Sequence, residues 1–572
     1  MSMDIFKANG RQRNGERLFL FLRRHSIMTL TGVLVLALFL LALVIPGPLV
    51  QFSHGINAWI YKYFGWFYLL LVLGMLLGSV ALAVSPWGSL RLGKPNEKPA
   101  FDNISWFAML FCAGMGTGFL FWGGAEPLLH FQNPPLVTGL PKEQALALTY
   151  FHWGLSPWAI YALTAVAIGY FCNRRGLPLQ FSRFLNCNKP WQRLVVDGFM
   201  ILALIFGIAA TFGMGVLMIE EGLASLLPVS EGAVLKIGII VAMTVLFLVS
   251  AYRGLSKGIR FLSNTSLTLT CLLLLLIFIL IPKDGLLERF VTSIAFYFQG
   301  LSGWSLGFGD FHPGNWPQTW TVKYWSWWLA WAPFVGSFIA LISKGRSIRQ
   351  VLIGSIIAPT MFSVVWFFVM GGAAIGWIES LQGIGANPPI SFSDAESVWF
   401  GMLDHYTHSL PLALFSIMMV GVFVCDSLDS ASFTLSCLSR YPDPEIQLES
   451  SESKVACEQC GLEVMLAHSV KEDPETGENS AMPEEGPFIY TFCWGVLLCL
   501  LTAALLLSGG IDILQEVTPI MVLPFSLLLV MVLGRFIYEL PQSASEQENV
   551  TLSLAALPPK PTCELHSCQM NR

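Results

Sequence analysis

The sequence predicts an all-α polytopic membrane protein with about twelve transmembrane helices. Hydrophobic residues make up 54% of its 572 residues and charged residues only 12%, too few to cover the surface of a soluble protein of this size. Apolar runs long enough to span a bilayer recur along the whole chain. Basic residues concentrate in every second connection between these runs, which predicts that both termini lie in the cytoplasm.

The apolar runs define the expected spans in order. The first seven cover residues 27–45, 64–84, 104–131, 145–171, 195–219, 234–249 and 262–281. An external amphipathic segment follows at 284–317, and five more runs cover 324–342, 351–377, 412–438, 488–507 and 520–537. Clusters of Lys and Arg follow the even-numbered spans, at 91–98, 174–193, 253–260 and 344–349. This alternation agrees with twelve crossings.

Polar segments lie outside the predicted bundle. Residues 1–26 are a cytoplasmic N-terminal segment, and the acidic loop 441–486 and the tail 541–572 have the composition of solvated linkers. The loop 379–409 is expected to hold a short helix at the outer surface. No basic stripe of the kind that binds nucleic acid is present. Most of the twelve cysteines fall in apolar spans, where they act as small hydrophobic residues. Four others form two close pairs, Cys457 with Cys460 and Cys563 with Cys568. These pairs could bind zinc, or their spacing could have arisen by chance.

The third span carries three alternating glycines, Gly114, Gly116 and Gly118. Each costs about 1 kcal/mol against alanine in a helix, so together they favour local unwinding. Unwound backbone at membrane depth is tolerated where it lines protein or a cavity. The alternative is close helix packing through small residues, although a spacing of two does not keep to one helical face.

The eighth span holds an unusual density of tryptophan, with Trp325, Trp327, Trp328 and Trp331 in seven residues. Pro333 and Gly336 follow and are expected to interrupt its helix. This span comes five helices after the glycine-rich one, and an odd number of spans per unit predicts that the second unit is inverted. The sequence therefore predicts two inverted five-helix repeats, 101–283 and 318–540, preceded by two additional helices in 27–100, with a binding site at the repeat interface.

The fourth span supplies aromatic residues that can face the eighth. Trp158 and Tyr161 are three residues apart and share a helix face, and Pro157 is expected to redirect Trp153 toward them. With Trp328 opposite, these rings are predicted to form an aromatic box for a quaternary ammonium group. The alternative reading is that they are ordinary core or interfacial aromatics.

Three long motifs resemble the betaine/choline/carnitine transporter family: AGMGTGFLFWGGAEP at 113–127, FHWGLSPWAIY at 151–161 and YWSWWLAWAPFVGSFIALISKGRSIR at 324–349. The similarity extends over most of the twelve spans. It implies the inverted-repeat fold shared with amino acid-polyamine-organocation transporters, a location in the cell's inner membrane, a homotrimer, and a small trimethylammonium or related zwitterionic solute as the transported molecule.

The resemblance also implies roles for matching residues. The family's aromatic box falls on Trp153, Trp158, Tyr161 and Trp328, with Trp331 on the path nearby. The segment around Ala113, Met115 and Gly118 resembles the part that meets the anionic end of the solute and the ions.

Coupling ions are implied at two positions. Phe334 matches a residue associated with one sodium position of sodium-coupled members. The second position uses backbone of the third span, here Cys112 and Met115, and side chains of the tenth, at Phe423, Asp426 and Ser427. Thr211 is a further possible ion ligand.

Asp426 departs from the family pattern, because a threonine is usual at its position. A carboxylate at membrane depth is costly and usually functional, so Asp426 could bind sodium, carry a proton, pair with another cation, or be an inert hydrogen-bonded group at a helix break. Sodium-independent members place a basic side chain from the fifth span here. That span, 195–219, has no Lys or Arg, which argues against the substitution.

We therefore expect a secondary transporter that imports betaine, choline, carnitine or an analogue by alternating access, driven by sodium or protons and without another cofactor. An ion-independent exchanger of the carnitine/butyrobetaine type is the alternative within this class. A membrane-embedded enzyme is more remote, because Glu126, His130, His152 and Asp426 are scattered over three spans without paired metal spacing. A channel is disfavoured, because a closed box retains its ligand.

Overall fold

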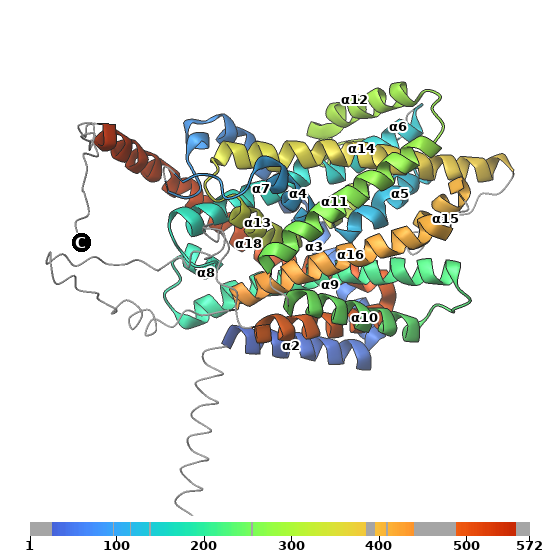
Figure 1. Ribbon diagram of the computed structural model, residues 1–572, viewed down its shortest axis with the longest axis horizontal. Coiled ribbons are helices and arrows are strands. Elements are labelled where there is room, and N and C mark those ends of the chain that lie inside the picture. Colours follow the sequence, from blue (N-terminus) through green and yellow to red (C-terminus); the bar gives the residue numbers. More distant parts are fainter. Residues whose placement is uncertain are drawn as a thin grey trace, which may run out of the picture.

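The computed structural model describes residues 26–94, 97–114, 116–136, 139–252, 255–384, 395–407, 410–439 and 488–555. Within these ranges the protein is helical, and β structure is limited to one isolated bridge between Arg91 and Ser347. Figure 1 shows the helices packed side by side in one elongated bundle. The acidic loop 441–486, both cysteine pairs, Met115 and residues 1–25 lie outside the described ranges.

The first half of the chain contains α2 (Ser26–Val44), α3 (Pro46–Val84), η1 (Pro86–Ser89), α4 (Asn103–Gly114), α5 (Thr117–Gln132), α6 (Pro141–Trp153), α7 (Leu155–Gly169), η2 (Tyr170–Arg174), α8 (Phe181–Phe184), α9 (Pro190–Leu226), α10 (Ala233–Tyr252) and α11 (Leu255–Leu280). The second half contains α12 (Leu286–Ser305), η3 (Pro317–Val322), α13 (Lys323–Ile342), α14 (Ile348–Gly383), α15 (Ala395–Thr407), α16 (Leu410–Leu438) and α18 (Phe488–Ala555).

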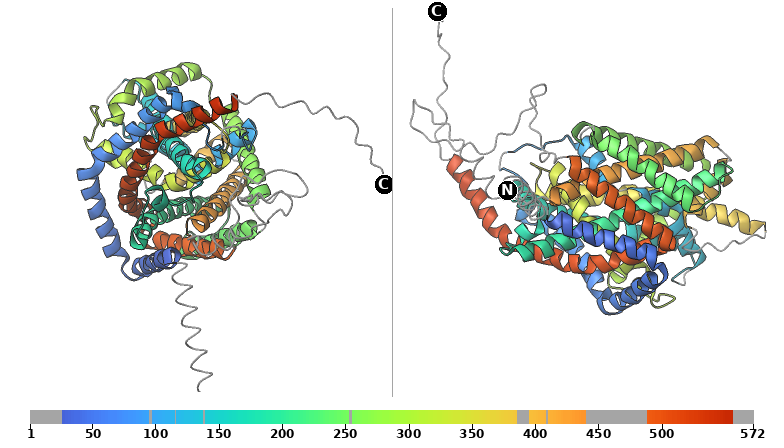
Figure 2. Two further views of the ribbon diagram at one scale, coloured as in Figure 1. Left: turned by 90° about the vertical axis from the view of Figure 1, so that its left-hand side faces the viewer. Right: turned by 90° about the horizontal axis from the view of Figure 1, so that it is seen from below.

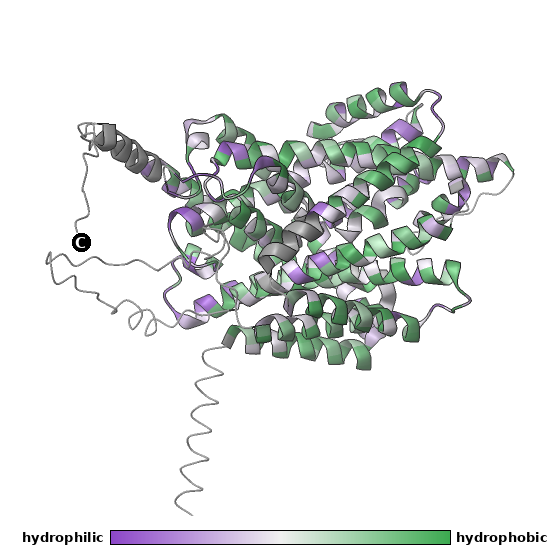
Figure 3. Cartoon of the chain, in the orientation of Figure 1, coloured by the Kyte–Doolittle hydropathy of each residue, from purple (hydrophilic) through white to green (hydrophobic). Residues whose placement is uncertain are grey.

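Ten helical segments of the described chain are long and apolar enough to cross a membrane. α18 contributes two of them, because its helix is kinked at Gly509 and Gly510. Apolar side chains also cover the outside of the bundle, as on α2 and α10, where Val33 and Val241 are exposed. Figure 3 shows that hydrophobic residues dominate the visible helix surfaces. Such a surface requires a lipid environment, so the chain is a multi-pass membrane protein.

Burial divides the bundle into an inner and an outer set of helices. The apolar stretches of α9, α6–α7 and η3–α13 are almost wholly buried, whereas α2 and α10 are mostly exposed. α13 packs against both α7 and α9. In the end-on view of Figure 2, α2 and α3 (blue) lie on the rim of the bundle. The aromatic and glycine-rich segments identified from the sequence therefore lie in its interior.

The prediction that Pro333 and Gly336 interrupt the eighth span is wrong. α13 is continuous from Lys323 to Ile342 and contains Pro333 in its interior. Ser337 Oγ donates a hydrogen bond to the Pro333 carbonyl, and neighbouring helices support such prolines in membrane proteins. Gly336 instead permits close packing, because a Cβ there would lie 2.7 Å from Thr164 Cγ2 of α7.

The interrupted helices in the interior are the third and fourth predicted spans. The third span is divided into α4 and α5, which end and begin at Gly114 and Thr117, so the interruption predicted from its glycines is confirmed. The fourth span is also broken, at Gly154, one residue after Trp153. The Leu155 N–H that this break frees donates to Tyr297 Oη of α12 at 3.0 Å. The amphipathic helix α12 thus supports the second break.

One polar region agrees with its predicted form and another differs from it. The short helix expected in 379–409 is present as α15, and it packs against α5 with Trp399 and Leu403 buried. The tail was expected to be a linker from residue 541 onward, but α18 continues through Pro541 to Ala555. No glycine follows Pro541 within this stretch to end the helix.

Candidate functional site

The break between α4 and α5 places backbone at the centre of the bundle. Gly116 is extended, with φ −101° and ψ −150°, and α5 begins at the next residue. The first N–H groups of a helix have no partner within it, and the helix dipole makes this end attractive to anions. The start of α5 can therefore present donors to a negatively charged group.

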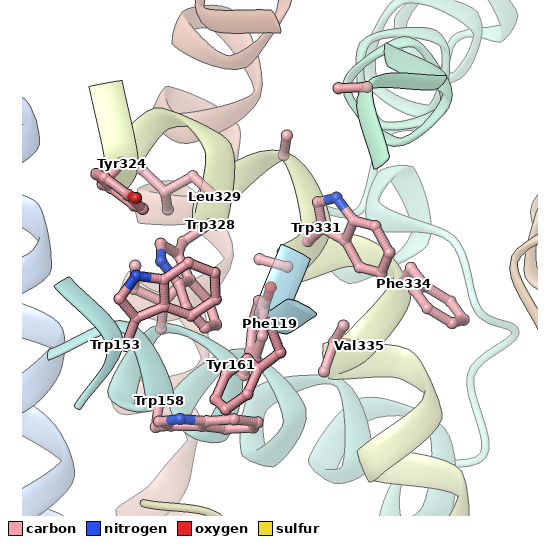
Figure 4. Packing of buried hydrophobic residues seen from close by; sticks show 14 of the residues in the cluster. Phe119, Trp153, Trp158, Tyr161, Tyr324, Trp328, Leu329, Trp331, Phe334 and Val335 are labelled. Carbon is pink, nitrogen blue, oxygen red and sulfur yellow. The ribbon is translucent and has the colours of Figure 1, made fainter. Parts of the chain in front are cut away.

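Four of the predicted box residues are brought together, as Figure 4 shows. Trp153 ends α6, Trp158 and Tyr161 lie on α7, and Trp328 comes from α13; all four are buried. The ring of Trp328 is the shared neighbour, with centroids 5.4 Å from Trp153, 5.9 Å from Trp158 and 5.0 Å from Tyr161. Residues far apart in the sequence thus converge from three helices.

Three of these rings, those of Trp153, Tyr161 and Trp328, line a cavity with about 310 Å³ of space between atoms, whereas Trp158 is not part of its lining. Its lining consists of aromatic side chains, glycines and one threonine: Gly114, Gly116, Gly118, Phe119, Trp153, Tyr161, Thr211, Trp327, Trp328 and Trp331. No charged side chain belongs to this described lining. The cavity therefore offers π faces and backbone, which suit a cation that carries no hydrogen-bond donor.

The glycines of this segment allow the indoles to approach the backbone. A Cβ at Gly114 would lie 2.3 Å from Trp158 Cη2, and a Cβ at Gly118 would lie 2.6 Å from Trp327 Cη2. Both distances are shorter than a real carbon contact. The glycines therefore shape the cavity as well as weakening the helix.

Trp331 and Phe334 lie apart from the four rings (Figure 4), with their own centroids 5.6 Å apart. Trp331 Nε1 donates to the Gly207 carbonyl of α9 at 3.1 Å, and its ring also lines the first cavity. Phe334 is buried beside Phe338 and does not belong to the described lining of that cavity. Trp331 thus both lines the cavity and contacts Phe334.

A second small cavity, with about 180 Å³ of space between atoms, lies where α5, α9 and α16 meet. Thr117, Thr211 and Ser427 bring three hydroxyl groups to its lining. The Thr117 hydroxyl is buried and has no hydrogen-bond partner in the described structure. Oxygen ligands of this kind suit a small hard cation, so this donor set fits sodium.

The structure gives less direct support for the other residues that were predicted to bind ions. Phe423 and Asp426 are buried on α16, but neither lines the two cavities in the described structure. Asp426 makes no hydrogen bond or ion pair with described residues, whereas Asp429, one turn away, accepts from Ser250 Oγ at 3.0 Å. Cys112 and Ala113 belong to the last turn of α4 by their backbone.

Sequence reasoning missed a buried polar cluster behind the box. Glu126, His130, His152 and Asp426 were treated as scattered over three spans, but the ligand atoms of Glu126, His130 and His152 all lie within 4.8 Å of one another. This grouping was detectable in part, because Glu126 and His130 are four residues apart on one helix face. His152 joins them because α5 packs against α6.

The cluster has the geometry of a hydrogen-bond network. His152 Nδ1 lies 2.7 Å from Glu126 Oε1, and Trp153 Nε1 donates to Glu126 Oε2 at 2.6 Å. The Tyr324 hydroxyl donates to the same Oε2. Although two imidazoles and a carboxylate are a possible metal-ligand set, both carboxylate oxygens already have close partners.

Comparison with known proteins agrees with this architecture. The family model described as BCCT, betaine/carnitine/choline family transporter, matches residues 26–456 and 476–545. The glycine betaine transporter OpuD of Bacillus subtilis is 34% identical over 533 residues, which cover 91% of this chain and 95% of the relative. The high-affinity choline transport protein of Escherichia coli is 31% identical, with 87% of this chain and 71% of the relative covered.

A third relative, the ectoine/hydroxyectoine transporter of Virgibacillus pantothenticus, is 29% identical over 85% of this chain and 90% of its own length. The match to the family model includes the helices that build both cavities. The resemblance inferred from the three motifs is confirmed, and the chain belongs to the betaine/carnitine/choline transporter family.

Proposed function

We propose that this protein is a secondary active transporter that imports a quaternary-ammonium or related zwitterionic solute, such as betaine, choline, carnitine or an analogue, by alternating access. The observation that carries the proposal is the convergence of Trp153, Trp158, Tyr161 and Trp328, three of which line one cavity. Each desolvated contact between a cation and such a ring is worth about 0.5–2 kcal/mol. The three relatives described above, which carry glycine betaine, choline and ectoine, support this class of solute.

The two ends of the solute have distinct partners in this proposal. The methylated head lies among the rings, and the carboxylate, where present, meets the N–H groups at the start of α5 near Gly118. On the family resemblance, we also assign Ala113 and Met115 to this end of the solute; Met115 lies outside the described residues. Because α4–α5 and α6–α7 are broken beside the cavity, the two halves of each span can move separately during alternating access.

We propose that the chain crosses the membrane twelve times, through the ten long helical segments and two further ones. These are the divided α4–α5 and α11, whose residues Asn264–Leu280 are apolar but shorter. With the N-terminus in the cytoplasm, the spans of 101–283 and 318–540 form the two inverted repeats. We further propose a homotrimer in the inner membrane, with both termini cytoplasmic and no enzymatic activity.

Sodium or protons are the proposed coupling ions. Thr117, Thr211 and Ser427 supply oxygen ligands at the small cavity. For the second position, the family resemblance also implies the backbone at Cys112 and Met115 and the side chains of Phe423 and Asp426, although Phe423 and Asp426 do not line that cavity. The first position lies near Phe334. The alternative of ion-independent exchange is disfavoured, because no Lys or Arg occurs in the 195–219 region of α9.

The proposed function is tested with the purified full-length protein in proteoliposomes. Saturable binding and counterflow of glycine betaine, choline or carnitine are expected. The isostere 3,3-dimethylbutanoate, in which carbon replaces the nitrogen of glycine betaine, should bind at least about tenfold more weakly than glycine betaine, since its head lacks the cation–π attraction. Failure of all three quaternary ammonium solutes to bind would contradict the proposal, and conversion of one into a new compound would favour an enzyme.

Replacing Asp426 with asparagine is expected to weaken the apparent affinity for the coupling cation by about tenfold. The buried carboxylate has no described partner, so a bound cation or proton would supply one. Uptake is measured in proteoliposomes against sodium concentration and against pH. Asp197→Asn is the matched control, because Asp197 is a buried carboxylate that accepts from Ser182 and lines neither cavity, and the ion dependence of this variant should equal that of the wild type. Identical ion dependence in Asp426→Asn would make Asp426 structural.

A further inference from the structure

Glu126 is a fully buried carboxylate that lies directly behind the aromatic box. It stands on α5, two turns beyond the glycine that borders the cavity, and does not line the cavity itself. A carboxylate removed from water is costly unless hydrogen bonds compensate for the lost hydration. Its retention in an apolar interior therefore requires an explanation from its partners.

Those partners come from three helical segments. On one side, His130 of the same helix lies 3.4 Å from Oε1, and His152 of α6 lies 2.7 Å from it. On the other side, Oε2 accepts from the Trp153 indole at 2.6 Å and from the Tyr324 hydroxyl of α13. Bonds to an ionised acceptor are the stronger kind, so Glu126 ties α6 and α13 to α5.

The bond to Trp153 distinguishes this ring from its neighbours. Trp153 is the last residue of α6 before the break at Gly154, so the helix does not continue beyond it. The indole N–H groups of Trp158 and Trp328 are buried without a hydrogen-bond partner in the described structure, whereas that of Trp153 is held by a carboxylate. The orientation of this wall of the box is thus fixed from behind.

Tyr324 connects the same carboxylate to the opposite wall. It lies four residues before Trp328 on α13, and therefore on the same face of that helix. Its ring also stacks on His152, with centroids 4.6 Å apart and an interplanar angle of 11°. One carboxylate oxygen thus sets the spacing between the wall from α6 and the wall from α13.

We propose that Glu126 is a positioning residue for solute binding, which fixes Trp153 relative to Trp328 through the shared acceptor Oε2. This inference rests on the proposed function, because it assigns the box its role in holding the methylated head. Glu126 does not touch the solute; its effect is transmitted through Trp153.

A double-mutant cycle with glycine betaine as the probe tests the inference. Glu126→Gln keeps the side-chain volume but leaves one neutral acceptor for two donors, and it should weaken binding by about tenfold. In a Trp153→Phe background the indole N–H is absent, so the additional effect of Glu126→Gln should fall below about threefold. An equal loss in both backgrounds, or unchanged affinity of the single variant, would overturn the proposal. Weak binding by the wild type would instead count against the proposed function.

Asp197→Asn is the matched control for the loss of a buried carboxylate. Asp197 accepts two hydrogen bonds from Ser182, from its N–H at 2.9 Å and from its hydroxyl, and lies near the start of α9 away from both cavities. This variant should bind glycine betaine as the wild type does. A comparable loss of affinity in Asp197→Asn would mean that removing any buried carboxylate impairs the protein. The effect of Glu126→Gln would then not be evidence that Glu126 positions Trp153.

A spectroscopic measurement tests the geometry without changing Glu126 and without any solute. In protein labelled with 15N at the indole nitrogens, the Trp153 and Trp328 signals are assigned by their loss in Trp153→Phe and Trp328→Phe. The Trp153 N–H proton should resonate downfield of the Trp328 proton and exchange more slowly, because a carboxylate accepts its bond. A Trp153 signal at or upfield of the Trp328 position would show that the bond is absent, whether or not Glu126→Gln folds.

Discussion

Replacing Trp328 with alanine is expected to abolish measurable binding of glycine betaine, choline and carnitine. The Trp328 ring contacts all three other members of the box, so its removal deletes one cation–π partner and the packing that holds the rest. The lost interaction energy is up to about 2 kcal/mol for the contact with the cation and about 0.5–1.5 kcal/mol for each ring pair. Together these losses predict that the affinity for the solute falls by about 100-fold or more. Calorimetric titration of the purified protein measures it.

The control must separate lost binding from lost stability, because truncating a buried tryptophan costs about 3–5 kcal/mol by itself. Trp494 is fully buried, and its indole donates to Ser439 Oγ, away from the cavity. Trp494→Ala should lower the melting temperature as Trp328→Ala does and keep the affinity for the solute. Trp328→Phe should fall between the two, since phenylalanine is a weaker cation–π partner. Wild-type affinity in Trp328→Ala would refute the box.

The main features of the interior were accessible from the sequence because they depend on residue type and short spacing. Three alternating glycines predicted the break between α4 and α5, and the interval of three between Trp158 and Tyr161 placed both rings on one face of α7. Their meeting with Trp328 was also predicted. That step needed the packing of α7 on α13, which the family resemblance implied and local sequence alone did not contain.

Other features depend on tertiary contacts that no local pattern reveals. Pro333 reads as a helix breaker, yet α13 remains continuous because neighbouring helices surround it. Gly154 gave no separate signal, although the fourth span breaks there with the support of Tyr297. The cluster around Glu126 likewise forms only when α5, α6 and α13 pack together. Sequence reasoning therefore found the rings of the candidate site and missed the contacts that hold them.

Replacing Gly114 with alanine is expected to impair solute binding nearly as severely, although it adds a single methyl group. The new Cβ would lie 2.3 Å from Trp158 Cη2, whereas ordinary contact begins at 3.4 Å, so the indole must shift by roughly 1 Å. Tyr161 and Trp328 pack against this ring, and a shift that relieves the clash displaces the box. Affinity for glycine betaine should fall by about 10- to 100-fold, as overpacking of about 1–3 kcal/mol would produce.

A nearly identical collision occurs elsewhere in the bundle and serves as the control. A Cβ at Gly354 would lie 2.5 Å from Trp106 Cη2, and neither residue belongs to the described cavity lining. Gly354→Ala therefore imposes the same type of strain on a buried indole that does not belong to the box. Both variants should lose comparable thermal stability, and only Gly114→Ala should lose affinity. If both bound glycine betaine equally well, the position of Trp158 would not matter for the solute; if both lost affinity equally, the effect would reflect general destabilisation rather than the shape of the site.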